Sequence, residues 1–336
     1  MPSSLFETKL TVCSGYARLF THLLKCMNYP ENKIKNINGY AKGYSFNPNN
    51  SIPPGHEWNA VYLNEKWCLI DTTWGAGSIS GSSFVPQYTE YYLCTPPERL
   101  IRSHFPQESQ SDFQLIEPKI SLDEFKWLAD IKPAFFELGF TKIIEDKRII
   151  NVCGVGKITL KYNTSIRPIL LVLFTKNDGG IESCIFMNKR IKQGYEINFY
   201  INEKNTYKLQ ISANKDGNNA YSNILYSTIN CNDDSPIVAK YYPDFYTDYE
   251  KINNIELIKP LDGKLNKGNS YDFEIKLSED GAELYLSVAA VEYAMEKNGD
   301  IFTKNDFLIT SDHVKIVYKN RAKNIDDSIL TYKTYE

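Results

Sequence analysis

A cysteine, a histidine and an aspartate of this chain stand in the order of a nucleophile, its base and the group that orients the base. Cys13 precedes an apolar pattern of helical period, and His56 and Asp71 lie in a segment rich in Trp, Val, Tyr, Leu and Ile. A thiolate attacks a carbonyl carbon, an imidazole takes the thiol proton, and a carboxylate holds the imidazole. These three residues are therefore the candidate catalytic residues of acyl transfer through a Cys13 thioester.

Residues 14–27 are predicted to form a helix that begins next to Cys13. Apolar side chains recur there at three- to four-residue spacing, namely Tyr16, Leu19, Phe20, Leu23, Leu24 and Met27. Asn28-Tyr29-Pro30 ends the pattern. A thiol at the start of a helix lies near the positive end of the helix dipole and near unpaired N–H groups, which favour a thiolate and could steady an oxyanion.

A β-hairpin is predicted to bring His56 and Asp71 together. The strands 57–63 and 66–71 flank Asn64-Glu65. If these two residues form the turn, Trp58 faces Asp71 and His56 lies one diagonal step away on the same face. Diagonal neighbours are about 7–8 Å apart at the backbone, within reach of an imidazole and a carboxylate.

Each of these residues could also have a purely structural role and take no part in a reaction. Cys13 could be a structural cysteine, His56 a satisfied polar group at a strand end, and Asp71 a cap or turn residue. His22 and Cys26 stand four apart on the predicted helix, but no further ligands cluster with them. No metal and no cofactor are therefore predicted, and His104 and His313 are interpreted as structural histidines.

The composition is that of a globular protein. The chain has 336 residues, of which 42% are hydrophobic and 24% charged, so two or three domains are expected. A net charge of −3 argues against nucleic acid as a partner, and no apolar run is long enough to span a membrane. The seven cysteines form no CxxC pair, and the first twelve residues lack the regions of a signal peptide. Reduced thiols and a cytoplasmic location follow as expectations.

The domain organisation is predicted from changes in pattern along the chain. Ser121-Leu122-Asp123-Glu124 fits a capping box, so a second helix is expected from Ser121 toward Ile131. From about residue 147 short alternating runs with turn residues predict a β-sandwich. The acidic, proline-containing segment 233–249 is interpreted as a linker. The predicted domains are 1–145, 146–235 and 250–336.

The two C-terminal modules are predicted to be copies of one unit. Gly194, followed by Phe199-Tyr-Ile and Leu209-Gln-Ile-Ser-Ala, is echoed by Gly268, Phe273-Glu-Ile and Leu284-Tyr-Leu-Ser-Val. The offset of 74 to 75 residues suits a repeated module of under 100 residues.

The sequence around the three candidate residues resembles a known family. The motifs are Val12-Cys13-Ser14-Gly15-Tyr16-Ala17-Arg18-Leu19-Phe20, Gly55-His56-Glu57-Trp58-Asn59-Ala60-Val61, and Trp67-Cys68-Leu69-Ile70-Asp71-Thr72-Thr73-Trp74-Gly75. Further matches are Pro96 to Ile101, His104-Phe105-Pro106 and Phe125 to Gly139. Together they resemble the transglutaminase-like superfamily and, more narrowly, the kyphoscoliosis peptidase family.

The resemblance implies a fold and a set of roles. The fold is α+β, with a papain-like (transglutaminase-like) cysteine-enzyme domain followed by two antiparallel β-sandwich (Ig-like) modules. Cys13 would be the nucleophile, His56 the general base and Asp71 the orienting carboxylate. The partners implied are protein substrates, among them cytoskeletal proteins.

Two questions stay open at this point. With water as acceptor the chain would be a peptidase or deamidase, and with a lysine amine it would be a cross-linker. The alternative is a non-catalytic scaffold that keeps the triad residues and binds cytoskeletal proteins. Relatives carry a longer stretch before the cysteine motif and usually a glycine where Val12 stands, whereas twelve residues precede Cys13 here. The expectation is a fragment, a shortened isoform or an inactive enzyme.

Overall fold

The structure is a computed structural model in which the chain divides into two compact units, residues 1–128 and 129–336. Each unit is described by itself. The residues that the structure describes are 11–43, 45–81, 83–163, 168–177, 179, 186–191, 193–201, 203–214, 220–232, 243–245 and 255–335. Among them, no helix has both the length and the apolar character needed to cross a membrane.

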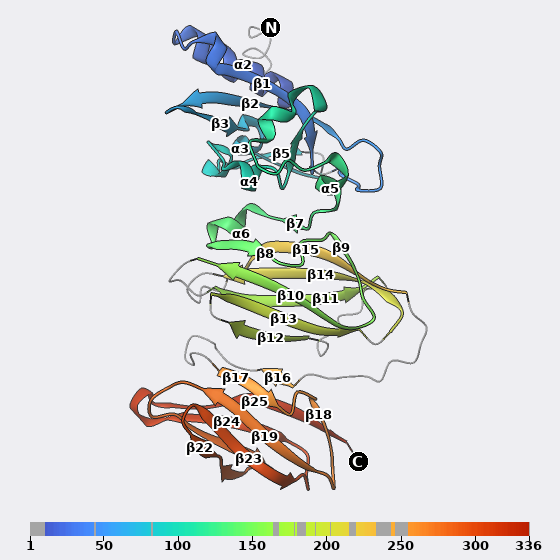
Figure 1. The fold of residues 1–336 in the computed structure, drawn as a ribbon, viewed down its shortest axis with the longest axis vertical. Coiled ribbons are helices and arrows are strands. Elements are labelled where there is room, and N and C mark those ends of the chain that lie inside the picture. Colours follow the sequence, from blue (N-terminus) through green and yellow to red (C-terminus); the bar gives the residue numbers. More distant parts are fainter. Residues whose placement is uncertain are drawn as a thin grey trace. The chain divides into compact units, whose positions relative to one another are not determined.

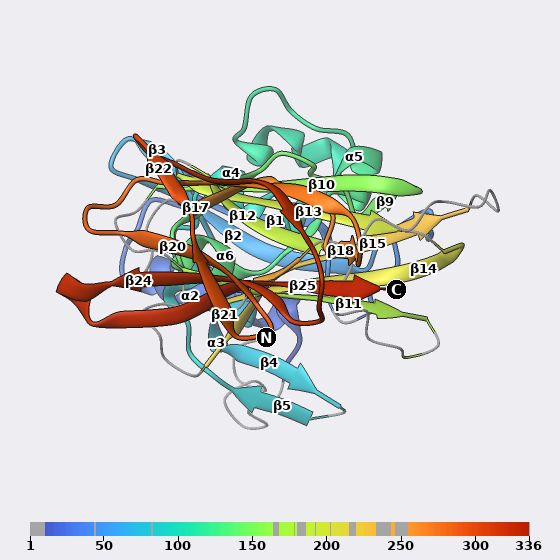
Figure 2. The same cartoon turned by 90° about the horizontal axis from the view of Figure 1, so that it is seen from below.

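The first unit is built on a four-stranded antiparallel sheet of order β3-β2-β1-β6, of which β1, β2 and β3 are labelled in Figure 1. The strands are β1 (Ile34–Ala41), β2 (Gly55–Leu63), β3 (Lys66–Ile70) and β6 (His104–Pro106). The helices are α2 (Cys13–Cys26), α3 (Thr72–Ala76), α4 (Pro97–Leu100) and α5 (Leu122–Trp127), with 3-10 turns at Glu31–Lys33, Glu90–Tyr92 and Glu108–Gln114. Figure 2 shows β4 (Gly77–Ser80) and β5 (Ser83–Pro86) side by side as a separate two-stranded hairpin.

The predicted hairpin is confirmed together with its register. Asn64 and Glu65 both have left-handed backbones, with φ of 47° and 65°, as a two-residue type I′ turn requires. The pairs run from Leu63–Lys66 to Asn59–Ile70, so the next step places Trp58 opposite Asp71. The first predicted helix is also confirmed, beginning at Cys13 and ending at Cys26.

The predicted helix after Ser121 is only partly right. Ser121 and Glu124 form the expected capping box, since the Glu124 N–H donates to Ser121 Oγ and the Ser121 N–H to Glu124 Oε2. The helix nevertheless ends at Trp127 instead of continuing to Ile131. Asp130–Ile131 form strand β7, which pairs with Leu225 and Tyr226 of a sandwich sheet. Pairing with a strand that lies far along the chain overrides the local helical pattern here.

The first β-sandwich consists of two antiparallel sheets, as predicted from the alternating runs. One sheet has the order β12-β13-β10-β8, and the other β11-β14-β15-β7 with β9 added in parallel beside β15. The strands are β8 (Phe140–Ile143), β9 (Ile149–Asn151), β10 (Gly154–Tyr162), β11 (Ile169–Lys176), β12 (Phe186–Ile191), β13 (Gly194–Ile201), β14 (Asn205–Asn214) and β15 (Ser222–Cys231). Since β7 and β8 belong to these sheets, the sandwich begins before the predicted boundary at residue 146.

A disulfide joins Cys153 and Cys231 in this sandwich. The expectation of uniformly reduced thiols is therefore wrong for this pair. Cys153 precedes β10 and Cys231 ends β15, so the bond ties one sheet to the other across the core. No CxxC motif indicates this bond in the sequence, because its two cysteines are 78 residues apart.

The second β-sandwich has sheets of order β16-β25-β24-β20-β21, with β18 beside β25, and β17-β19-β23-β22. The strands are β16 (Asp244–Phe245), β17 (Ile255–Lys259), β18 (Lys264–Asn266), β19 (Ser270–Leu277), β20 (Glu283–Val288), β21 (Val291–Ala294), β22 (Glu296–Asn298), β23 (Ile301–Leu308), β24 (Val314–Asn320) and β25 (Ile325–Tyr335). Its core is a separate cluster that includes Phe273, Leu286 and Ile316.

The predicted repeat corresponds to equivalent strands. β13 and β14 carry the first copy and lie in opposite sheets of one sandwich, while β19 and β20 carry the second and do the same in the other. The predicted linker 233–249 falls mostly outside the described residues. Within its described part, residues 243–245, Asp244–Phe245 pairs with Leu330 and Thr331 and so belongs to the second sandwich.

Candidate active site

Asp71 is the centre of the site, because its two oxygens are used on different sides. It follows β3 and caps the N-terminus of α3, where Oδ1 accepts the N–H groups of Thr73 at 2.8 Å and Trp74 at 3.0 Å. Oδ2 accepts from His56 Nε2 at 2.7 Å and from His104 Nε2 at 2.8 Å. The carboxylate is 1% exposed, so each of its oxygens is satisfied by protein donors rather than by solvent.

This set of donors keeps Asp71 ionised. Burial raises the pKa of its carboxyl, but the hydrogen bonds from His104 and His56 lower it by more, and the pKa lies well below its usual range. An ionised carboxylate can only accept hydrogen bonds, so each partner of Asp71 must be a donor. Both imidazoles must therefore carry hydrogen on Nε2.

His56 presents its other ring nitrogen to the site. With Nε2–H donated to Asp71, the neutral imidazole keeps its lone pair on Nδ1. Among the described residues none makes a hydrogen bond to that Nδ1 atom. The His56 ring contacts two indoles, with ring centroids 6.1 Å from that of Trp58 and 5.5 Å from that of Trp74, and its side chain is 8% exposed. The arrangement leaves one basic nitrogen free in a largely apolar setting.

His104 belongs to the same cluster, so the interpretation of it as a lone histidine is wrong. Burial lowers the pKa of the His104 imidazole despite the opposing effect of Asp71, and the ring is neutral in the folded chain. Its Nε2–H goes to Asp71, so Nδ1 accepts the hydroxyl hydrogen of Ser103 at 2.8 Å. The ring centroids of Trp74 and His104 lie 4.5 Å apart.

The sheet explains how two histidines reach one carboxylate. β1 lies between β2 and β6, pairing Gly39 with His56 and Ala41 with His104. A Cβ atom at Gly39 would collide with the Trp58 ring and with the Phe105 carbonyl, so only glycine lets the indole pass over β1. His104 lies 33 residues beyond Asp71, and no local spacing links the two. In the sequence, the signal for His104 was its place in the His104-Phe105-Pro106 block, one of the matches to the family.

Cys13 is the first residue of α2, and its side chain is half-buried. Val12 at the N-cap offers no side-chain cap, and no acidic residue stands in the first turn. α2 packs against β2 and α3. Within the described part of the chain, the Cys13 thiol makes no hydrogen bond, so the structure joins His56, Asp71 and His104 directly and leaves Cys13 unbonded.

Asn59 fixes α2 to the strand that carries His56. This asparagine is fully buried on β2, and its amide donates to the Ala17 carbonyl at 3.1 Å and to Thr21 Oγ1 at 3.1 Å. Ala17 lies one helical turn after Cys13. The position of the thiol relative to His56 therefore depends on a polar contact between α2 and β2.

The cluster also has the composition of a metal site. His56, Asp71 and His104 bring one ligand atom each to within 4.8 Å of one another, and two imidazoles with a carboxylate are ligands that zinc accepts. The 2.7 and 2.8 Å distances, however, join each nitrogen to the same oxygen at ordinary hydrogen-bond length. We interpret the cluster as hydrogen-bonded for this reason.

Comparison with known proteins identifies one module of the chain. Residues 122–242 match the family model of the KY-like, immunoglobulin-like domain, so the first sandwich is an Ig-like module that follows a unit with a buried His–Asp–His cluster. Kyphoscoliosis peptidase of Homo sapiens is 31% identical over 241 residues, covering 69% of this chain and 34% of that protein. The chain belongs to the kyphoscoliosis peptidase family. It spans about a third of the length of that relative.

More distant similarities extend the comparison. The LIM and transglutaminase domain protein ltd-1 of Caenorhabditis elegans is 27% identical over 137 residues, covering 37% of this chain and 18% of that protein. Among solved structures, a chimeric titin Z1Z2–Z1Z2 tandem aligns with a TM-score of 0.19 and 10% identity, covering 56% of this chain and 94% of that one.

Proposed function

We propose that the first unit is a papain-like, transglutaminase-like domain that transfers acyl groups from protein amides through a thioester on Cys13. The observation that supports this most is the His56–Asp71 hydrogen bond at 2.7 Å through Nε2. It leaves Nδ1 as the proton acceptor, on a residue of β2, and the helix that begins with Cys13 packs against that strand. The membership of a family whose relatives are named peptidase and transglutaminase-domain proteins agrees with this chemistry.

In the proposed reaction the Cys13 proton passes to His56 Nδ1 and the thiolate attacks the amide carbonyl carbon. The C–N bond breaks, and the leaving amine or ammonia takes the proton from the imidazolium. Water then cleaves the thioester in a peptidase or deamidase, whereas a lysine amine takes the acyl group in a cross-linking reaction. Asp71 remains ionised throughout and stabilises the imidazolium.

The test compares two cysteines on one helix. Cys13 begins α2 and Cys26 ends it, so the unpaired N–H groups of the helix start lie beside the first cysteine alone. At neutral pH, Cys13 should react with iodoacetamide faster than Cys26, although Cys26 is the more exposed. His56→Ala should slow Cys13 and leave Cys26 unchanged. Equal rates in the parent chain, unaffected by His56→Ala, would refute the mechanism.

A turnover assay then separates the two acceptors. A glutamine-bearing peptide is offered with a fluorescent primary amine, and both amine incorporation and ammonia release are measured. Ammonia without incorporation indicates hydrolysis, and incorporation indicates cross-linking. Cys13→Ala should abolish both.

One observation favours a non-catalytic scaffold as second candidate. The Cys13 thiol is not hydrogen-bonded to His56, so the pair that a cysteine enzyme needs is not joined. A scaffold predicts no turnover with any amide and equal binding of a partner by the parent chain and Cys13→Ala.

A further inference from the structure

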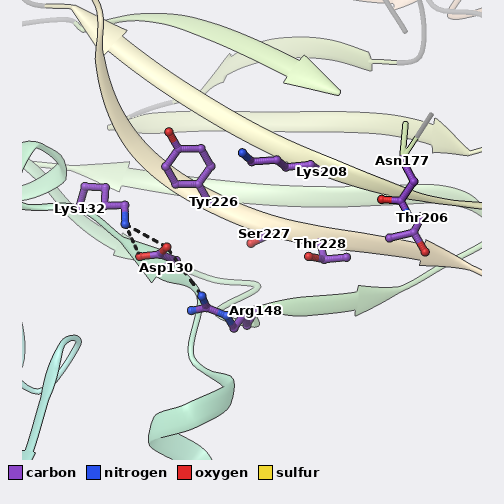
Figure 3. A pocket seen from close by; sticks show the side chains of 9 residues that line it. All are labelled: Asp130, Lys132, Arg148, Asn177, Thr206, Lys208, Tyr226, Ser227 and Thr228. Carbon is purple, nitrogen blue, oxygen red and sulfur yellow. Dashed lines mark hydrogen bonds and ion pairs between the residues drawn. The ribbon is translucent and has the colours of Figure 1, made fainter. Parts of the chain in front are cut away.

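The first sandwich carries a cavity of about 460 Å³ on one sheet, away from its core (Figure 3). β14 contributes Thr206 and Lys208, and β15 contributes Tyr226 and Thr228. The alternate residues of the same strands, such as Leu209 and Leu225, are buried in the sandwich core. The cavity therefore lies on the outer face of the sheet, and its volume is within the range of about 300–1,000 Å³ typical of ligand sites.

The lining of this basic cavity is cationic. It contains the side chains of Lys132, Arg148 and Lys208 against the single carboxylate of Asp130. Hydroxyl groups and an amide make up most of the rest, and no aliphatic side chain lines it. An apolar ligand would find little to pack against, whereas an anionic one would find an excess of positive charge and hydrogen-bond donors.

The positive charges fall into two groups on either side of Tyr226. On one side, Asp130 holds Lys132 at 2.9 Å and Arg148 at 3.9 Å. On the other side, Lys208 makes no ion pair with any residue that the structure describes. The ammonium nitrogens of Lys132 and Lys208 lie 5.4 and 4.9 Å from the Tyr226 ring centroid, so both groups flank one aromatic surface (Figure 3).

The edge of the sheet is closed at this point. β7 pairs with Leu225 and Tyr226, and β9 pairs with 228–230, so the β15 backbone beside the cavity is already hydrogen-bonded. A bound chain could not add there as a further strand. Recognition must then come from side chains, which at this site means from charge and from the tyrosine.

We propose that the basic cavity binds an acidic peptide segment of a partner protein, independently of Cys13. One carboxylate of the segment pairs with Lys208, a second is shared by Lys132 and Arg148, and the peptide between them lies over Tyr226. A single inorganic anion would engage only one of the two cationic groups and would leave most of the volume unfilled. Charge complementarity over two separated groups therefore favours a segment with at least two Asp or Glu residues.

The test uses the full chain and a fluorescent hexapeptide that contains three glutamates, with the matching glutamine peptide as control. Fluorescence polarisation should show salt-sensitive binding of the acidic peptide alone. Lys208→Gln should weaken binding about three- to fivefold, the scale of one exposed ion pair. Asp130→Asn should strengthen it, because the competing carboxylate is removed. Lys142→Gln, an exposed lysine of the opposite sheet, should leave it unchanged.

Other results would overturn the proposal. Equal binding of the glutamine peptide, or an equal loss of affinity in Lys208→Gln and Lys142→Gln, would show that the cavity does not recognise carboxylates. Tighter binding of orthophosphate or of a short single-stranded RNA, with the same dependence on Lys208, would assign the cavity to another anion. Melting curves of each variant ensure that a loss of binding is not a loss of fold.

Discussion

His104 donates its Nε2–H to the same oxygen of Asp71 that accepts from His56, at 2.8 and 2.7 Å. The candidate orienting carboxylate is thus held from two sides by imidazoles and from a third by the backbone of α3. Each donor that stabilises the anion also makes it a weaker base. Asp71 is suited to position His56 and stabilise its charged form rather than to take its proton.

Asp71→Asn is expected to cost both reactivity and stability. An asparagine offers one oxygen and one NH2 group, so either the two imidazoles or the two backbone N–H groups would face a donor. The site would lose the orientation of His56, so we expect turnover to fall by about 10³- to 10⁴-fold and Cys13 alkylation to slow. The melting temperature should fall as well, because buried donors lose their acceptor.

The matched control is Asp112→Asn, since the Asp112 side chain is exposed and, among the residues that the structure describes, pairs only with Lys119. The control variant should change neither the reactivity of the site nor the melting temperature. An Asp71→Asn chain that melts and reacts like the parent would show that the carboxylate has no role in the site.

A zinc chelator should leave the melting temperature and the Cys13 reactivity of the parent chain unchanged if the cluster is hydrogen-bonded as described.

Acid should destabilise the first unit in two stages. Burial lowers the pKa of folded His104, so below its ordinary value of about 6.5 the unfolded chain binds a proton that the folded chain does not, and stability falls as pH decreases. The hydrogen bonds of Asp71 hold its folded pKa below the unfolded value of about 4, so a second loss begins below that pH.

The first stage can be assigned with His104→Gln. Glutamine does not titrate but can still place an N–H near Asp71. Calorimetric melting temperatures between pH 7.5 and 5 should fall less steeply in this variant than in the parent, or in His313→Gln as control. Parallel curves for all three chains would show that His104 is not the titrating group.

Asn59→Ala should loosen α2. The change removes the donors to Ala17 and Thr21, and we expect a loss of about 1–3 kcal/mol in the free energy of unfolding of the first unit. If the helix is thereby displaced, Cys13 labelling should slow while Cys26 labelling does not. Asn50→Ala, on an exposed loop, is the control. An unchanged Cys13 rate despite lowered stability would mean that Asn59 supports the fold and not the thiol.

The disulfide makes a separate prediction for the first sandwich. Alkylation without reductant should leave Cys153 and Cys231 unmodified, and peptide mapping should find them joined. Cys153→Ala together with Cys231→Ala should lower the free energy of unfolding by about 2–4 kcal/mol, because a long loop of the unfolded chain is no longer closed. Ready alkylation of both cysteines would restore the expectation of reduced thiols.

The parts that could be predicted from the sequence are those set by local patterns. The helix from Cys13 follows from its apolar spacing, and the register of the hairpin follows from its two-residue turn, which brings Asp71 to His56. His104 and the Cys153–Cys231 bond could not be derived, because each depends on a contact between segments far apart in the chain. The predicted end of α5 was wrong for the same reason, since β7 pairs with a strand almost a hundred residues further on.

All four tryptophans of the chain, at positions 58, 67, 74 and 127, lie in the first unit, and neither sandwich has one. Two of these indoles pack against the site histidines, Trp58 beside His56 and Trp74 beside His104. Selective excitation of indole therefore follows the first unit alone in the intact chain, without labels or truncation. Because a protonated imidazole quenches a neighbouring indole, the emission also serves as a built-in optical indicator of the charge state of the site.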